Sequence, residues 1–182
     1  DDFMITGRRH CFVHQFEVGH DDEGRLLAAD VEMISRAGFS ADLSAPVMAR
    51  ALCHFDNAYW LPAVDINGYC ARTNTQSNTA FRGFGGPQGA MAVEVIMDSV
   101  ARRLGKDALD VRLANLYGTT ERNTTPYGQR VDDTIIDALV KNALLVQDVC
   151  PDADELLHDV ECAVNGYFQK TLERSRAGPA SA

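Results

Sequence analysis

The residues with the clearest chemical potential lie together in one short stretch, NTQSNTAFRGFGGPQGA, which spans residues 74–90. It places Arg82 beside a glycine-rich turn and two residues before the aromatic ring of Phe84. A guanidinium next to an aromatic face can bind a flat heterocycle that also forms hydrogen bonds. Glycines let another group approach the backbone closely, and amides at a helix N-terminus can face an anion or a polar oxygen. The stretch predicts a binding loop for a planar, polar ligand.

The same stretch is also compatible with a plain turn before a helix. Two nucleotide-binding motifs are excluded by its spacing. No Gly-Lys-Ser/Thr follows the glycines, as a P-loop requires, and the GxGxxG spacing of a dinucleotide fingerprint is absent. The pairing of Arg82 with Phe84 is what favours a binding site over a turn.

Other residues that could bind a metal are spread too widely to form a site. His14 and His20 have no further ligands at suitable spacing, so we expect exposed strand and loop positions. The cysteines are odd in number and form no CxxC pair, which predicts reduced thiols, mostly in the core. They are Cys11, Cys53, Cys70, Cys150 and Cys162.

Length and composition are typical of a globular domain. The chain has 182 residues, of which 46% are hydrophobic, enough for one domain with a core. A net charge of −9 argues against broad nucleic-acid binding, which needs a basic face. No apolar run approaches the roughly 18–20 residues that cross a bilayer.

Alternating and helical patterns predict the elements around the loop. Strands are predicted at residues 11–18, 26–35 and, interrupted near Pro62 and Gly68, 59–72. Helices are predicted at residues 45–57, 87–104, 106–116 and 132–145. The first two strands should form a hairpin, and the strands and helices occur in separate runs. The predicted fold class is therefore α+β, with antiparallel strands and packed helices.

Residues with strong local preferences should define the helix ends. Pro87 suits a first turn, and Gly105 suits the end of the same helix. Ser40 or Ser44 could cap the helix at 45–57. Glu94 and Asp98 fall near the polar face of the long helix and are expected to be solvated rather than acid–base groups.

The segment SNTAFRGFGGPQG resembles the substrate-pocket segment of the molybdenum hydroxylases, specifically the molybdopterin-binding subunit of the xanthine dehydrogenase/oxidase family. Three further segments agree in order: DDFMITGRRH, VMARALCHFDNAY and EVIMDSVARRLGKDALDVRLANLYG. The resemblance implies that residues 1–145 are part of a molybdenum-cofactor-binding domain. Residues 146–182 read as a divergent helical segment with a disordered tail.

The resemblance implies roles for four residues that their types alone do not fix. Arg50, by itself a surface arginine, takes the position of a catalytic, substrate-binding arginine that faces the purine. Phe84 takes the position of the ring that stacks on the substrate. Arg82 and Gly83 match cofactor-binding positions, with Arg82 contacting the molybdenum centre through its backbone. Arg50 also favours the purine branch over relatives that oxidise aldehydes.

The resemblance also implies an intact enzyme larger than this chain. Such enzymes hydroxylate hypoxanthine to xanthine and then to urate, using molybdenum-molybdopterin, FAD and 2Fe-2S clusters. The iron-sulfur/FAD parts would be partner domains or a partner subunit, in a cytoplasmic homodimer without nucleic-acid or membrane partners. No Glu-Pro-Pro segment with a catalytic glutamate is present, so the chain reads as a fragment that is inactive alone. An aldehyde oxidase-type hydroxylase, a non-catalytic purine-binding module and a structural domain remain as alternatives.

Overall fold

The computed structural model describes residues 7–132, 134–136 and 138–140. The chain divides into two compact units, residues 1–134 and 135–182. In the second unit, the Leu139 amide donates to the Ile135 carbonyl at 2.9 Å, the spacing of one helical turn. The predicted boundary after residue 145, and the whole of the segment 146–182, lie outside the described residues.

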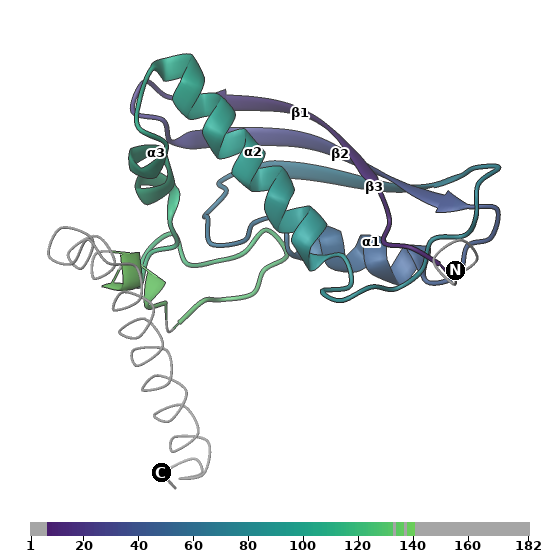
Figure 1. The fold of residues 1–182 in the computed structure, drawn as a ribbon. Helices are drawn as coiled ribbons and strands as arrows, with labels where there is room; N and C mark the ends of the chain where they lie inside the picture. The colour runs from purple at the N-terminus through teal and green to yellow at the C-terminus, as the bar shows by residue number, and fades with distance from the viewer. Residues whose placement is uncertain (1–6, 133, 137, 141–182) are drawn as a thin grey trace, which may run out of the picture. The chain divides into compact units, whose positions relative to one another are not determined.

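The first unit is built on a three-stranded sheet in the order β1-β2-β3 (Figure 1). Strands β1 (Phe12–His20) and β2 (Leu26–Gly38) pair antiparallel, which confirms the predicted hairpin. Strand β3 (Val64–Arg72) pairs with β2 in parallel. The α+β class is confirmed, but the sheet is mixed, because the chain crosses over through a helix between β2 and β3.

The predicted ends of the long helix are confirmed, and the helix that follows it has a side-chain cap that was not predicted. Helix α2 (Gly86–Leu104) has Pro87 in its first turn and ends at Gly105, whose φ of 63° is left-handed. Helix α3 (Ala108–Asn115) begins at Asp107, whose side chain accepts a 2.7 Å hydrogen bond from the Leu109 amide. A cap of this kind typically stabilises a helix by about 1 kcal/mol.

The start of helix α1 (Ser44–Cys53) differs from the prediction. Its cap residue is Leu43, and no side chain caps it. The predicted serine cap is wrong because Ser44 is buried inside the first turn, where its hydroxyl lies 2.8 Å from His10 Nε2. Ser44 therefore joins the N-terminal segment to α1.

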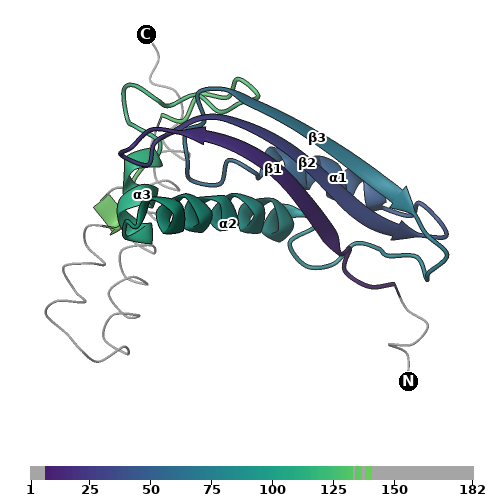
Figure 2. The same cartoon turned by 90° about the horizontal axis from the view of Figure 1, so that it is seen from above.

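The core lies between one face of the sheet and helices α1 and α2 (Figures 1 and 2). Side chains of β2 alternate, so that Val31 and Met33 are buried while Asp30 is exposed on the opposite face. Burying one such apolar side chain is worth about 1.5–3 kcal/mol. The other largest fully buried apolar residues are Val47, Phe55, Val93, Ile96, Met97 and Val111.

Three cysteines correct the expectation that thiols fill the core. Cys11, Cys53 and Cys70 are free and exposed. Cys53 is the last residue of α1 and Cys70 lies on the edge strand β3, positions that the core does not cover. Cys150 and Cys162 lie outside the described residues. No helix in the described ranges has both the length and the hydropathy of a membrane span.

Candidate functional site

The loop before α2 has an unusual backbone. Gly83, Phe84 and Gly85 have φ angles of 88°, 50° and 102°, so three successive residues are left-handed. The turn is closed by hydrogen bonds from the Phe84 amide to the Phe81 carbonyl (2.8 Å) and from the Gly86 amide to the Gly83 carbonyl (2.9 Å). A left-handed residue other than glycine costs about 1–2 kcal/mol and persists only where its surroundings hold it. Phe84 is therefore held in place by the structure around it.

Helix α1 provides much of that support through direct backbone contact. A Cβ atom added at Gly85 would collide with the Val47 carbonyl oxygen, and one added at Gly89 would collide with that of Ala51. These two glycines let the first turn of α2 lie directly against the α1 backbone. Only glycine fits at both positions, which explains part of the glycine-rich pattern.

Arg50 lies where α1 meets this loop. It is exposed in the last turn of α1, and its Nε lies 3.9 Å from the position that a Cβ would take at Gly86. Gly86 follows Phe84 by two residues. His54 Nδ1 lies 2.9 Å from the Arg50 carbonyl oxygen, which closes the helix end. The structure thus brings the segments that carry Arg50 and Phe84 next to each other.

The other two predicted site residues, Arg82 and Gly83, are exposed at the tip of the loop. The Arg82 carbonyl oxygen accepts a 2.6 Å hydrogen bond from Arg9 Nη2. The Arg9 guanidinium also lies over the Phe81 ring, 4.4 Å from its centroid. Sequence reasoning missed Arg9, although it lies in the GRRH segment that carries part of the resemblance. Its contact spans 73 residues, so no local pattern could reveal it.

The buried polar atoms that have no hydrogen-bond partner among the described residues include Arg9 Nη1 and Gln88 Oε1, beside the loop. The other end of the Gln88 amide donates to the His10 carbonyl at 3.4 Å. A buried polar atom without a partner costs about 1–3 kcal/mol. One donor and one acceptor are therefore available here for groups that the described residues do not provide.

Glu94 and Asp98 are engaged in an ion-pair network, which corrects the expectation of a solvated face. Arg112 of α3 donates to Glu94 Oε2 and to Asp98 Oδ1, each at 2.8 Å. The Tyr59 hydroxyl donates to Glu94 Oε1 at 2.7 Å. Burial, reinforced by Glu94, raises the pKa of Tyr59. The network joins α2 to α3.

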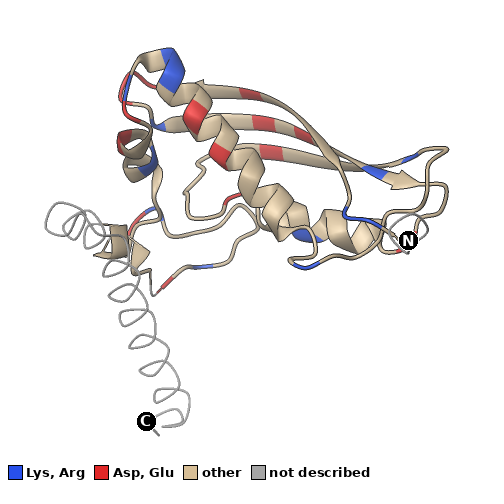
Figure 3. Cartoon of the chain, viewed as in Figure 1, with Lys and Arg blue, Asp and Glu red and all other residues tan. Residues whose placement is uncertain are grey.

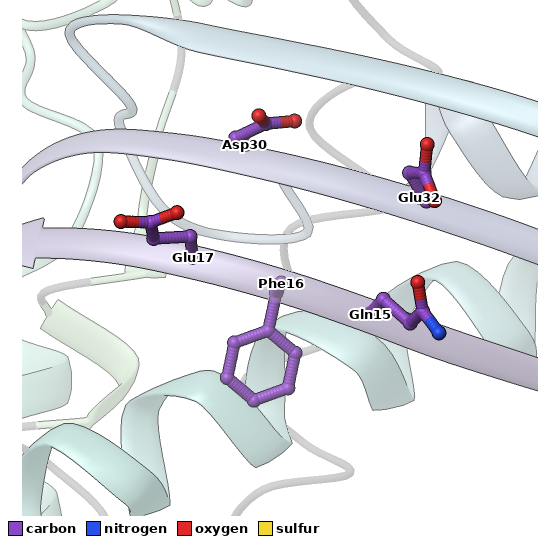
Figure 4. Close-up of a pocket in the computed structure, with 5 residues that line it drawn as sticks. All are labelled: Gln15, Phe16, Glu17, Asp30 and Glu32. Carbon is purple, nitrogen blue, oxygen red and sulfur yellow. The ribbon is translucent and has the colours of Figure 1, made fainter.

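A hollow on the outer face of the sheet is a second candidate, but it does not involve the loop. Figure 4 shows that Phe16 points away from the carboxylates around it, as strand alternation requires. Acidic residues from all three strands gather on this face (Figure 3), where Asp30 pairs in register with Glu17 and Asp65. Within the described ranges, no group of three or more His, Cys, Asp or Glu side chains could hold a metal ion. The lining residues are Gln15, Phe16, Glu17, Asp30 and Glu32.

Comparison with known proteins identifies the kind of domain that carries this loop. The family model described as "Molybdopterin cofactor-binding domain" matches residues 1–116, which include both α1 and the glycine-rich loop. The chain belongs to the molybdopterin cofactor-binding domain family. The resemblance to the molybdenum hydroxylases is confirmed, and molybdopterin is the cofactor that the family binds.

Relatives of this molybdopterin-binding domain include enzymes with different named substrates. Xanthine dehydrogenase of Drosophila subobscura is 44% identical over 144 residues, which are 79% of this chain and 11% of the relative. Nicotinate hydroxylase of Emericella nidulans is 43% identical over 133 residues, which are 73% of this chain and 10% of the relative. The chain thus spans about a tenth of the length of these relatives.

Solved structures share the fold at lower identity. Aldehyde oxidoreductase from Desulfovibrio gigas matches 98% of this chain with a TM-score of 0.70 and 22% identity, over 17% of its own length. Quinoline 2-oxidoreductase from Pseudomonas putida matches 91% of this chain with a TM-score of 0.67 and 24% identity, over 21% of its own length. These matches confirm the fold of a molybdopterin-binding domain.

The described residues fit such a cofactor. Arg9 Nη1 and Gln88 Oε1 provide an unpaired donor and an unpaired acceptor beside the loop. The left-handed turn at residues 83–85 holds the exposed loop tip in one shape. A polar, hydrogen-bonding group beside this turn would satisfy atoms that otherwise stay buried and unpaired.

Proposed function

We propose that this chain forms the substrate-pocket part of a molybdenum-dependent purine hydroxylase. The observation that carries the proposal is the position of Arg50, whose Nε lies against Gly86 at the end of the loop that contains Phe84. A cation and an aromatic ring on adjacent segments suit a flat heterocycle that gains negative charge during the reaction. Relatives named xanthine dehydrogenase, at 43–46% identity, support the purine as substrate.

Each proposed site residue has a separate role. Arg50 stabilises the negative charge that develops on the heterocycle, and Phe84 stacks on the face of the ring and orients it. Arg82 and Gly83 would hold the cofactor, and Arg82 would contact the molybdenum centre through its backbone, whose carbonyl also accepts from Arg9. When bound, the molybdenum cofactor supplies oxygen-atom insertion and accepts two electrons.

The rest of the enzyme is part of the same proposal. A chain that spans about 11% of a relative's length needs further domains to complete its site. We propose that it belongs to a longer cytoplasmic polypeptide or complex with 2Fe-2S and FAD domains, which acts as a homodimer. In this proposal the chain is inactive alone.

Substitution of Arg50 in the full-length protein tests the function. Arg50→Met should lower kcat/KM for xanthine by about 100-fold or more, because it removes about 2.7 kcal/mol of charge stabilisation. The molybdenum content should not change. Arg103→Met, which removes an exposed arginine from the far end of α2, is the matched control. Equal turnover of xanthine by the two variants would contradict the proposal.

A second candidate is the hydroxylation of another nitrogen heterocycle. It is favoured by the nicotinate hydroxylase, whose identity of 43% is close to that of the xanthine dehydrogenases. Turnover assays of the full-length protein separate the possibilities. Preference for xanthine or hypoxanthine indicates a purine hydroxylase, preference for nicotinate indicates this second candidate, and preference for benzaldehyde indicates an aldehyde oxidase-type enzyme. Micromolar xanthine binding without turnover would instead indicate a non-catalytic module.

A further inference from the structure

Arg9 makes two contacts to the loop from a distant part of the chain. Its Nη2 donates to the Arg82 carbonyl at 2.6 Å, and its guanidinium lies 4.4 Å from the centroid of the Phe81 ring. The first contact fixes the backbone just before the left-handed residues, and the second fixes the ring that begins the turn. Together the two contacts hold Phe81 and Arg82, the residues that lead into the left-handed turn at Phe84.

The residues on either side of Arg9 fix its position. On one side, the Arg8 carbonyl accepts a 3.0 Å hydrogen bond from the Thr79 amide. On the other side, the buried side chain of His10 pairs with Ser44, and its carbonyl accepts from Gln88. Burial lowers the pKa of His10, so its ring is neutral near pH 7. Arg9 is therefore presented to the loop by a backbone that is attached to α1, α2 and the loop itself.

We propose that Arg9 is a positioning residue that locks the Phe81–Phe84 turn in the shape that binds substrate. It acts through Phe84 and does not touch the substrate. A planar guanidinium can donate a hydrogen bond in its plane while its face covers an aromatic ring, whereas a lysine ammonium is a point donor. The effect on catalysis rests on the proposed function, whereas the effect on the shape of the loop does not.

Hydrogen exchange in the full-length protein tests the lock directly. Peptides that cover residues 79–88 contain the Phe84 and Gly86 amides, whose hydrogen bonds close the turn. Arg9→Gln should accelerate exchange at these amides by about tenfold or more, because the turn then opens more often. Arg103→Gln, on an exposed position of α2, should leave them unchanged. Unchanged exchange in Arg9→Gln would overturn the proposal.

A pair of Phe81 variants keeps the test valid if Arg9→Gln does not fold. Phe81→Leu removes the ring beneath the guanidinium, whereas Phe81→Tyr keeps it. Phe81→Leu should accelerate exchange in the same peptides, and Phe81→Tyr should not. The double variant Arg9→Gln/Phe81→Leu should exchange little faster than Arg9→Gln alone, because the two residues form one contact. Equal exchange in the leucine and tyrosine variants would contradict the lock.

Kinetics then show whether the lock serves the substrate. Arg9→Gln should raise KM for xanthine about tenfold and change kcat per bound molybdenum by less than about threefold, because a loose Phe84 weakens binding in ground and transition states alike. Arg9→Lys should show the same fast exchange and the same raised KM as Arg9→Gln, because a lysine cannot make both contacts. A wild-type protein without hydroxylase activity would refute the proposed function, while the exchange data would still decide the role of Arg9. Normal KM together with fast exchange would refute the link between loop and substrate.

Discussion

At the scale of single residues, Asp56 and Tyr117 show how this fold holds a buried polar pair. Both side chains are 5% exposed, and the Tyr117 hydroxyl donates to Asp56 Oδ2 at 2.6 Å. Burial raises the pKa of Asp56, although the hydrogen bond from Tyr117 acts in the opposite direction. The folded protein therefore binds a proton at Asp56 more tightly than the unfolded chain does.

Because the pKa of Asp56 is raised in the folded protein, the stability of the fold depends on pH, and one variant can isolate this contribution. The stability that Asp56 contributes is present below its ordinary pKa of 3.8 and is lost as the pH rises through the folded value. Asp56→Asn keeps an acceptor for Tyr117 and removes the titration. The stability of wild type relative to Asp56→Asn should fall as the pH rises above the ordinary pKa of 3.8, measured by exchange protection of residues 54–60 in the full-length protein. A difference that is constant with pH would show that Asp56 has an ordinary pKa.

Single residues also show where sequence reasoning ends. The types and spacing of Arg82 and Phe84 were sufficient to locate the loop, because glycine, proline and aromatic residues have strong local preferences. Arg9 and Asn115 could not be found in that way. Asn115 donates to the Val111 carbonyl within its own helix. It also donates to the Gly24 carbonyl and accepts from the Leu26 amide, and these two contacts exist only once distant segments have packed.

At the scale of elements, helices were predicted more accurately than strand pairing. The interval 87–104 agrees with α2 to within one residue, because Pro87 and Gly105 mark its ends locally. The hairpin of β1 and β2 followed from its turn, in which Asp21 Oδ1 accepts from the Arg25 amide at 2.7 Å. The parallel pairing of β3 was not predicted, because it depends on where α1 packs against the sheet.

The junction of α2 with α3 depends on one arginine. Arg112 bridges Glu94 and Asp98, and its side chain is 27% exposed. Arg112→Met should destabilise this junction by about 1–2 kcal/mol, because two partly buried carboxylates lose their shared cation. Exchange of the α3 amides in the full-length protein measures the effect. Arg103→Met, an exposed α2 position, is the control, and an equal effect of both changes would contradict the bridge.

At the scale of the whole molecule, the described residues provide a loop of defined backbone shape with unpaired buried polar atoms beside it. Arg9 Nη1 and Gln88 Oε1 lack partners, and no cluster of metal-ligating side chains lies within the described ranges. Under the proposed function, in which further domains complete the site, the 182-residue chain purified alone should contain no tightly bound molybdenum and should not turn over xanthine. Metal analysis and a urate assay measure both, with the full-length protein as control. Stoichiometric molybdenum with turnover would refute the requirement for further domains.

Under the proposed function, the contact of Gly85 and Gly89 with the backbone of α1 also limits how substrate specificity can change. Neither helix can slide past the other without a collision of main-chain atoms, so the backbone positions of residues 50 and 84 are fixed relative to each other. New substrate preferences would then arise by exchanging side chains on that fixed backbone rather than by reshaping it. Enzymes of this lineage that act on dissimilar molecules should superimpose closely here and diverge in what residues 50 and 84 carry.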